Sequence, residues 1–368
     1  MNPELLISTR TRKTPFSSRV AACGAKAYTV YNHMLLPSVF LSLEEDYWHL
    51  CEAVQVWDVS CQRQIEITGK DSQKLVQLMT PRDLSQAEYG QCFYAPLCDE
   101  NGGMINDPII IKHSEDHWWL SIADTDVMLW AMGLATGFSL DVQVSEVEIW
   151  PLAVQGPKAE ELITRVFGEE IRKIRFFHSR KMNYDGNEFL VARSGWSKQG
   201  GFEIYVNDAE LGVQLWDELF SKGVDLNVRA GCPNLIERVE SGLLSFGGDM
   251  GYDNTPFECG LDQYVSLEAD IESLSIDALR TRPVKTRLMG LVMEQQVNLK
   301  DLRLMNDGKV IGMITSNTWS PKHSVHLAFA KCDIGSIADV RDLHVNSSTG
   351  EVPAKITKLP FNFESLGL

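Results

Sequence analysis

The segment from residue 189 to residue 206, FLVARSGWSKQGGFEIYV, holds the polar side chains best placed to bind a ligand. Its pattern predicts two strands around a glycine-rich bend, and side chains on a strand point alternately to its two faces. Glu203 and Tyr205 therefore project together, away from the apolar residues of the second strand. A carboxylate beside a phenol can hydrogen-bond a small polar molecule, although a solvent-exposed strand face would show the same alternation. Gly200 and Gly201 favour the binding interpretation, because glycine lets a flat ligand approach the backbone closely.

Signatures of several other enzyme classes are missing from the chain. It has no phosphate-binding loop, no dinucleotide-binding glycine motif, no H-E-x-x-H zinc helix and no G-x-S-x-G nucleophile elbow. The eight histidines are dispersed and none pairs with a cysteine at metal-ligand spacing, so we expect no metal. The eight cysteines form no C-x-x-C pair, which favours reduced thiols and a cytoplasmic location.

Length and charge narrow the function classes further. The 368 residues predict roughly two or three domains, and 44% hydrophobic with 23% charged residues is typical of a packed globular chain. With 34 basic and 50 acidic residues the net charge is −16, so we expect no nucleic-acid partner. No apolar run reaches the roughly 18 residues of a membrane span, so we expect no membrane partner. The expected partner is a small-molecule substrate, and the oligomeric state stays open, a homodimer included.

Strand and helix patterns alternate irregularly along the chain, which favours an α+β fold over a doubly wound sheet. Residues 64–69 alternate like a half-buried strand, and residues 107–113 and 117–123 predict a strand pair. Apolar residues at helical spacing predict helices over about residues 157–167 and 208–222, each followed by a glycine.

The last ninety or so residues differ from the rest in their pattern of short apolar runs and turns. Short apolar runs at 302–305 and 310–315 flank the turn Asn306-Asp307-Gly308, a pattern that predicts a hairpin. From about residue 275 onward we therefore expect a small all-β module. We expect two other approximate domain boundaries, near residues 48 and 150.

Several short motifs follow one another along the chain in a recognisable order. They are Trp57-Asp58-Val59-Ser60, Ile67-Thr68-Gly69-Lys70-Asp71, Gly102-Gly103-Met104-Ile105, Gln155-Gly156-Pro157-Lys158, Gly200-Gly201-Phe202-Glu203-Ile204, Arg238-Val239-Glu240-Ser241-Gly242 and Ser320-Pro321. In this order the chain resembles the aminomethyltransferase (glycine-cleavage T-protein) family of tetrahydrofolate enzymes over nearly its whole length. Each motif is weak alone, and their shared order carries the resemblance.

Other segments are similar to one branch of that family, the dimethylsulfoniopropionate demethylases. These segments are Arg12–Phe16, Asn32–Pro37, Glu45–His49, Leu78–Leu84 and Gly103–Pro108. The resemblance implies transfer of a methyl group from dimethylsulfoniopropionate to tetrahydrofolate, which leaves methylthiopropionate. It implies tetrahydrofolate as the methyl acceptor and no metal.

The resemblance also implies an α+β fold of three domains, arranged as a cloverleaf around a central folate channel and ending in a small C-terminal β-barrel. Residues 1–47 together with 151–274 would form the folate-binding domain. Residues 48–150 would form a second α+β domain, and residues 275–368 the barrel.

Individual site residues follow from the same resemblance. Glu203 matches the family glutamate that binds the pterin ring, Tyr94 a tyrosine of the folate site, and Ser121 a position near the methyl donor. A donor with a sulfonium and a carboxylate needs aromatic faces and a polar partner. The expected site residues are Tyr205 (catalytic and cofactor-binding), Glu203 and Tyr94 (cofactor-binding), and Ser121, Trp196, Phe16 and Lys13 (substrate-binding). Structural roles remain open for Tyr94 as a strand aromatic, Trp196 as core, Ser121 as a strand residue and Lys13 as a surface cation.

Two departures from the T-protein pattern bear on the activity. Asn106 replaces the first member of an acidic pair after Gly-Gly, and Asp107 follows it, which argues against the glycine-cleavage reaction itself. Cys232 stands in a stretch where the family has an arginine linked to folate, so another cation would have to replace it. Two alternatives stay open: a related demethylase of a methoxylated aromatic acid or a methylated amine, and a non-catalytic folate-binding protein.

Overall fold

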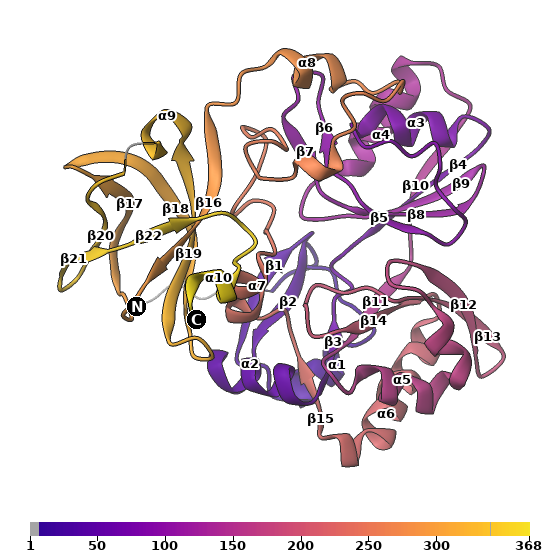
Figure 1. The fold of residues 1–368 in the computed structure, drawn as a ribbon. Coiled ribbons are helices and arrows are strands. Elements are labelled where there is room, and N and C mark those ends of the chain that lie inside the picture. Colours follow the sequence, from indigo (N-terminus) through magenta and orange to yellow (C-terminus); the bar gives the residue numbers. More distant parts are fainter. Residues whose placement is uncertain (1–6, 339) are drawn as a thin grey trace.

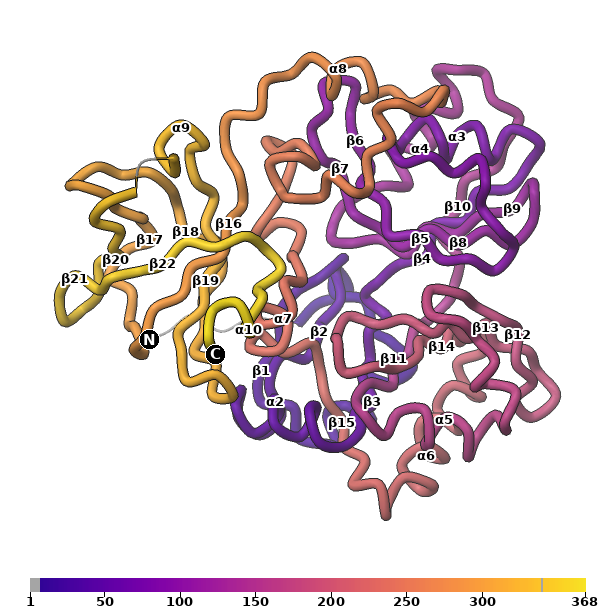
Figure 2. Tube along the Cα trace, viewed as in Figure 1, coloured from indigo at the N-terminus to yellow at the C-terminus, as the bar shows by residue number. Residues whose placement is uncertain are grey.

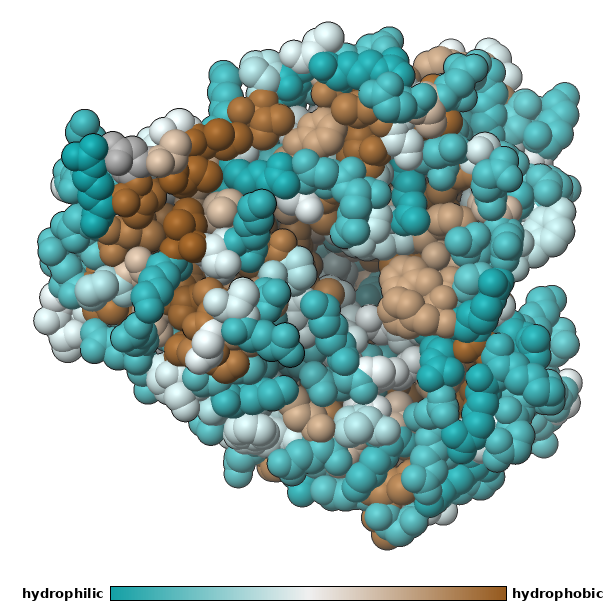
Figure 3. Space-filling model, viewed as in Figure 1, coloured by the Kyte–Doolittle hydropathy of each residue, from teal (hydrophilic) through white to brown (hydrophobic). Residues whose placement is uncertain are grey.

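The computed structural model describes residues 7–338 and 340–368. Three lobes surround a central region, each built on its own sheet (Figures 1 and 2). The hairpin of β1 (Ala27–Tyr31) and β2 (Met34–Val39) lies between the lobes, near the centre. Hydrophilic side chains cover much of the face in Figure 3, and this face is hollowed where the lobes meet.

The first lobe carries a six-stranded sheet in the order β12-β13-β14-β11-β3-β15. Its strands are β3 (Val54–Asp58), β11 (Trp150–Gln155), β12 (Ser179–Tyr184), β13 (Asn187–Ala192), β14 (Gly201–Val206) and β15 (Val228–Gly231), and only the β3–β15 pair is parallel. Helices α1 (Ser17–Ala22), α5 (Ala159–Phe167) and α6 (Ala209–Lys222) contribute to the core on one face of this sheet. The two long helices confirm the predicted ones: Gly168 (φ 81°) ends α5, and Asp208 caps the amides of Glu210 and Leu211 at the start of α6.

The second lobe carries a five-stranded sheet in the order β10-β4-β9-β8-β5. Its strands are β4 (Gln64–Thr68), β5 (Cys92–Tyr94), β8 (Ile109–Ser114), β9 (His117–Ser121) and β10 (Gln143–Val147), and its helices are α3 (Ser72–Met79) and α4 (Val127–Gly137). The predicted strand pair is confirmed, because β8 and β9 run antiparallel. On β9, Trp118 and Leu120 enter the core of the lobe, so the alternate residues face the other way.

The third lobe is a curled seven-stranded sheet in the order β21-β20-β17-β18-β19-β16-β22. Its strands are β16 (Thr286–Met293), β17 (Leu299–Asn306), β18 (Lys309–Ser320), β19 (Val325–Asp333), β20 (Leu343–Ser347), β21 (Gly350–Pro353) and β22 (Lys355–Thr357), with short helices α9 (Ile334–Ile337) and α10 (Phe363–Leu366). The predicted hairpin is confirmed: Asn306 pairs with Lys309, and Asp307 (φ 47°) and Gly308 (φ 73°) form its two-residue turn.

Shorter elements connect the lobes. They are α2 (Leu43–Glu52), β6 (Leu97–Cys98), β7 (Met104–Asn106), η1 (Glu169–Lys173), η2 (Val224–Leu226), α7 (Leu235–Ser241), η3 (Asp262–Tyr264) and α8 (Ile276–Thr281). The division into three domains stays a proposal. Because β3 pairs with β11 and β15, we propose that the second domain begins after Asp58 rather than at residue 48.

Candidate functional site

Strand β14 turns its polar residues toward the second lobe. Phe202 and Ile204 lie in the core beneath α5 and α6, whereas Tyr205 lies on the opposite face with Cys92 and Ile111 of the second lobe. The predicted alternation is therefore confirmed. The alternative of a solvent-exposed strand face is wrong, because Glu203 is 5% and Tyr205 1% exposed.

Glu203 is a buried carboxylate with one of its two oxygens hydrogen-bonded. Its Oε2 accepts a hydrogen bond from the Ser194 hydroxyl at 2.5 Å, and among the described residues none donates to Oε1. Burial raises the pKa of Glu203, and the Ser194 bond partly offsets this. A carboxylate in this state can accept N–H donors of a ligand at its second oxygen.

The glycine-rich bend before β14 packs against the protein itself. A Cβ on Gly201 (φ 155°) would lie 2.3 Å from the carbonyl oxygen of Val154 and 2.5 Å from Nε2 of Gln155. Gln155 donates to the Ser194 carbonyl at 3.2 Å and accepts from the Ser197 hydroxyl at 2.8 Å, which fixes the bend. The space beside Gly201 is therefore taken up by β11 and Gln155, whereas a Cβ on Gly200 would meet nothing within 4 Å, so close approach of a flat ligand at this bend stays a prediction.

Ser121 of β9 faces the same region from the second lobe. Its Oγ accepts a hydrogen bond from Nε2 of Gln64 at 2.9 Å, and Gln64 also donates to the carbonyl of Gln62 at 2.7 Å. Since Ser121 accepts here, its own proton is available to another acceptor. Burial and the Glu203 charge raise the pKa of Tyr205, and a hydrogen bond with Ser121 lowers it, so these three side chains meet between the two sheets.

Trp119 belongs to the same face of β9, two residues before Ser121. Its ring centroid lies 6.1 Å from that of Tyr205, and its Nε1 donates to Glu66 at 3.0 Å. Trp119 and Gln64 were not among the site residues expected from the sequence. The strand alternation of residues 117–121 was the available signal, because it groups Trp119 with Ser121.

Tyr94 and Asp107 form a second buried pair. The Tyr94 hydroxyl donates to Oδ2 of Asp107 at 3.0 Å, and the Tyr94 ring meets Tyr264 edge-on at 4.8 Å. The other oxygen of Asp107, Oδ1, is buried and has no hydrogen-bond partner. Burial raises the pKa of Asp107 to about 7, while the Tyr94 bond and the backbone amide of Asp107 itself act in the opposite direction. Asp107 was not among the site residues expected from the sequence.

Strand β5 connects this pair to the residues between the sheets. Cys92 packs in the same cluster as Tyr205, and burial together with the Glu203 charge raises the pKa of its thiol to about 12. Tyr94 lies two residues further on the same face of the strand, roughly 7 Å along it. Tyr94 itself packs in a neighbouring cluster with Tyr264, so Tyr94 and Asp107 lie next along this strand from Cys92 and Tyr205.

The two departures from the family pattern both have structural roles here. Asn106 is fully buried, donates to the Thr125 hydroxyl at 2.8 Å and accepts from the Ala123 amide at 3.0 Å. Cys232 packs in the apolar core of the first lobe. Arg238, one of the cations near this stretch in sequence, pairs with buried Asp249 at 2.9 Å.

Three expected substrate-binding residues lie apart from this cluster. Phe16 is fully buried on the other face of the six-stranded sheet, where it stacks on Trp216 at 5.8 Å, so its ring has no surface free for a ligand. Trp196 is half-buried, with the Arg238 guanidinium 5.9 Å from its ring centroid. Lys13 is exposed and makes no ion pair with a described residue.

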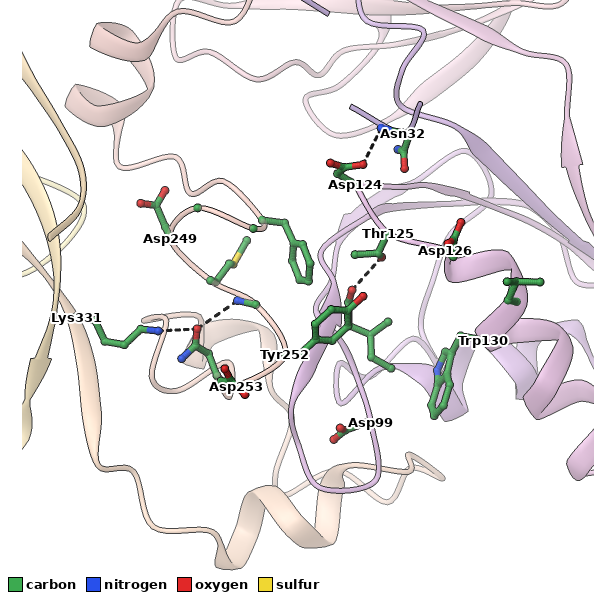
Figure 4. A pocket seen from close by; sticks show the side chains of 18 of the residues that line it. Asn32, Asp99, Asp124, Thr125, Asp126, Trp130, Asp249, Tyr252, Asp253 and Lys331 are labelled. Carbon is green, nitrogen blue, oxygen red and sulfur yellow. Dashed lines mark hydrogen bonds between the residues drawn. The ribbon is translucent and has the colours of Figure 1, made fainter. Parts of the chain in front are cut away.

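A pocket of about 1150 Å³ opens where the lobes meet (Figure 4). Asn32 lines it beside Asp124, whose carboxylate accepts from the backbone N–H of Asn32 at 2.7 Å. Lys331 of the barrel donates to the side-chain oxygen of Asn254 at 2.9 Å. The lining is predominantly acidic: its carboxylates belong to Asp99, Glu100, Asp124, Asp126, Asp249 and Asp253. Thr125 connects the pocket wall to Asn106, next to Asp107.

Within residues 7–338 and 340–368, no group of three or more histidine, cysteine, aspartate or glutamate side chains could hold a metal ion. No helix in those ranges is long and apolar enough to cross a membrane.

Comparison with known proteins gives relatives over almost the full length. The chain is 47% identical over 353 residues to the dimethylsulfoniopropionate demethylase DmdA of Ruegeria pomeroyi, which covers 95% of this chain and 97% of that protein. It is 28% identical to an aminomethyltransferase of Desulfitobacterium hafniense, over 87% of this chain and 89% of that one. The crystal structure of the glycine cleavage system aminomethyltransferase T from Bartonella henselae superposes with a TM-score of 0.84 at 21% identity, over 96% of this chain and 98% of that one, which confirms the fold.

Two family models account for most of the chain. The GCVT N-terminal domain matches residues 16–269, and the glycine cleavage T-protein C-terminal barrel domain matches residues 286–362. The resemblance seen in the short motifs is thereby confirmed, as is the C-terminal barrel. The chain belongs to the glycine-cleavage T-protein family.

Proposed function

We propose that this protein transfers a methyl group from dimethylsulfoniopropionate to tetrahydrofolate, giving methylthiopropionate and 5-methyltetrahydrofolate. The observation that carries the proposal is the 47% identity, over 95% of the chain, to a protein named as a dimethylsulfoniopropionate demethylase. Asn106 supports it from the site, because a fully buried amide with both ends bonded leaves no carboxylate where the T-protein pattern has one.

The residues between the two sheets fit a folate. Glu203 has a second oxygen open to N–H donors, which suits the aminopyrimidine edge of a pterin. Tyr205 and Tyr94 present aromatic surface along the same region, and burial holds the pKa of both phenols well above the usual value, so they stay neutral. When bound, tetrahydrofolate supplies the nucleophilic nitrogen, and the protein supplies its position.

The donor is a zwitterion, and the site offers a partner for each end. Ser121 accepts from Gln64 and hydrogen-bonds Tyr205, and its hydroxyl can turn to donate to the donor carboxylate instead. Tyr205 and Trp119, whose ring centroids lie 6.1 Å apart, offer aromatic surface for the sulfonium, an attraction of roughly 0.5–2 kcal/mol per ring. The acidic pocket favours approach of the cationic end. Trp196 and Lys13 stay proposed donor contacts, although both lie apart from these residues.

Methyl transfer depends mainly on the alignment of the methyl carbon with the attacking nitrogen. A sulfonium leaves readily, so its methyl carbon needs to lie about 3–3.5 Å from the attacking nitrogen, in line with the breaking bond. The buried sheet interface excludes water and holds Glu203 and Ser121 on opposing strands, which fixes the two reactants relative to one another. Methyl transfer from a sulfonium to this nitrogen does not require a metal, and we propose none.

The test is anaerobic incubation of the purified protein with tetrahydrofolate and dimethylsulfoniopropionate, with both products followed by chromatography. Equal amounts of 5-methyltetrahydrofolate and methylthiopropionate are expected. A donor panel with a methoxylated aromatic acid and a quaternary amine is the specificity control. Turnover of a panel donor without turnover of dimethylsulfoniopropionate would refute the substrate, and folate binding without any product would favour a binding protein.

Two coarser expectations complete the proposal. We propose a cytoplasmic location, where tetrahydrofolate and reduced thiols are both maintained, and small molecules rather than nucleic acid as partners. Fractionation of source cells and size measurement of the purified protein test the location and the open question of a homodimer.

A further inference from the structure

Asp107 stands out among the buried carboxylates because one of its oxygens is left without a partner. Oδ2 accepts from the Tyr94 hydroxyl at 3.0 Å, whereas Oδ1 is buried with no hydrogen bond. An unpaired buried acceptor costs free energy, so such atoms in a folded protein call for an explanation. A ligand group that donates a hydrogen bond or a proton would satisfy Oδ1.

The surroundings of Asp107 hold it in one position. On one side is Asn106, bonded to Thr125 and to the Ala123 amide, and on the other is Pro108, which restricts the backbone of the residue before it. Tyr94 is packed in turn against Tyr264. The carboxylate is therefore preorganised, with Oδ1 as its free atom.

The proposed reaction, on which this inference rests, creates a proton that must leave. The lone pair of the secondary amine nitrogen of tetrahydrofolate forms a bond to the methyl carbon, and the carbon–sulfur bond breaks with its electron pair on sulfur. The nitrogen then carries four bonds, a positive charge and one proton. Loss of that proton to a base gives neutral 5-methyltetrahydrofolate, and the base gains one proton.

The other polar groups of the buried region are poor candidates for this base. Glu203 is assigned to the pterin edge, and its Oε2 is taken by Ser194. Tyr94 and Tyr205 keep their protons at neutral pH, because burial holds their pKa values well above the usual one. Ser121 is a neutral hydroxyl, whereas Asp107 is a carboxylate with one oxygen that has no hydrogen bond.

We propose that Asp107 is a catalytic residue that accepts the nitrogen proton at Oδ1 during methyl transfer, and that Tyr94 is a positioning residue that holds Oδ2. Oδ1 is the open acceptor, because the Tyr94 hydroxyl engages Oδ2 and leaves Oδ1 without a hydrogen bond.

The protonation state of Asp107 suits this task. Its pKa of about 7 leaves it ionised above neutral pH and able to accept a proton near the working pH. The titratable groups that face it are Tyr94 of β5, Tyr31 of β1 and Cys259, and burial raises the pKa of all three, so they remain neutral beside it. Methyl transfer should therefore rise with pH through about 7.

The test compares Asp107→Asn and Tyr94→Phe with the wild type and with Asp307→Asn, a control in the exposed barrel turn where asparagine before glycine keeps the turn type. Single-turnover methyl transfer is measured from pH 5.5 to 9, and tetrahydrofolate binding by tryptophan fluorescence. Asp107→Asn should lose roughly 100-fold or more in transfer rate and its pH dependence, with folate affinity within about threefold. Infrared difference spectra of the wild type should show one carboxylic acid titrating near pH 7 that is missing from Asp107→Asn.

Tyr94→Phe separates a positioning role from a merely structural one. The Tyr94 hydrogen bond lowers the pKa of Asp107, so removing it should move the midpoint of the rate profile to higher pH and the infrared titration with it. An undiminished rate in Asp107→Asn, or a wild-type profile in Tyr94→Phe with an unmoved titration, would overturn the inference while the proposed function stands. Absence of product from the wild type would refute the proposed function, and this inference with it.

Discussion

Replacing Asp107 by asparagine should change how the stability of the protein depends on pH, in a direction that burial determines. Folding raises the pKa of Asp107 from 3.8 to about 7. Between these values the unfolded chain has lost the proton while the folded chain keeps it, so the folded state binds more protons. The stability contributed by the protonated group is fully present below pH 3.8 and is lost as the pH rises through about 7. Asparagine has no proton to lose and removes this dependence.

The magnitude follows from the size of the shift. The shift is about 3 pKa units, each worth about 1.4 kcal/mol, which gives an upper bound of roughly 4 kcal/mol across the whole range. Between pH 5 and pH 8 only the part up to about 7 contributes, or roughly 2–3 kcal/mol. Relative to the wild type, Asp107→Asn should therefore gain about that much stability on going from pH 5 to pH 8. Its amide still offers an oxygen to the Tyr94 hydroxyl.

Thermal unfolding at pH 5, 6, 7 and 8 measures this, with tryptophan fluorescence as the probe and Asp307→Asn as the matched control. The difference in Tm between Asp107→Asn and the wild type should grow by roughly 3–6 °C from pH 5 to pH 8, most of it between pH 5 and 7. The control should track the wild type at every pH. Parallel curves for Asp107→Asn and the wild type would show that Asp107 titrates in the folded protein as it does in water, and would refute the reasoning.

Three further substitutions test the site and its scaffold. Glu203→Gln should weaken tetrahydrofolate binding roughly 10- to 100-fold, the value of a charged hydrogen bond, in a fluorescence titration, and unchanged affinity would remove Glu203 from the folate site. Ser121→Ala should raise KM for dimethylsulfoniopropionate roughly 5- to 15-fold with folate affinity unchanged, and a loss in folate affinity instead would contradict its assignment to the donor. Gly201→Ala should cost roughly 3 kcal/mol, because its Cβ would lie 2.3 Å from the Val154 carbonyl oxygen. Gly200→Ala, with φ 84° and open space around the new Cβ, should cost only about 1 kcal/mol, so equal Tm losses for the two glycines would contradict the packing argument.

Local features of the fold could be predicted from the sequence because they depend on neighbours along the chain. Alternation on β14 placed Glu203 and Tyr205 on one face, and this is what the burial of the strand confirms. Helix α6 begins after Asp208 and ends before Gly223, as capping residues and apolar spacing indicate. The Asp307-Gly308 turn follows from the same kind of local rule. The family followed from the order of short motifs along the chain.

The site itself depended on tertiary structure, since its residues meet only when two sheets pack face to face. Ser121 reaches Tyr205 across that interface, 84 positions away in the sequence, and no periodicity encodes such a contact. The same packing placed Gln155 against Gly201, on a bend where the sequence suggested room for a ligand. It also left Oδ1 of Asp107 buried without a partner. Alternation determines which face a side chain takes, but what that face meets, and therefore its solvation and pKa, is decided by the packing of distant segments.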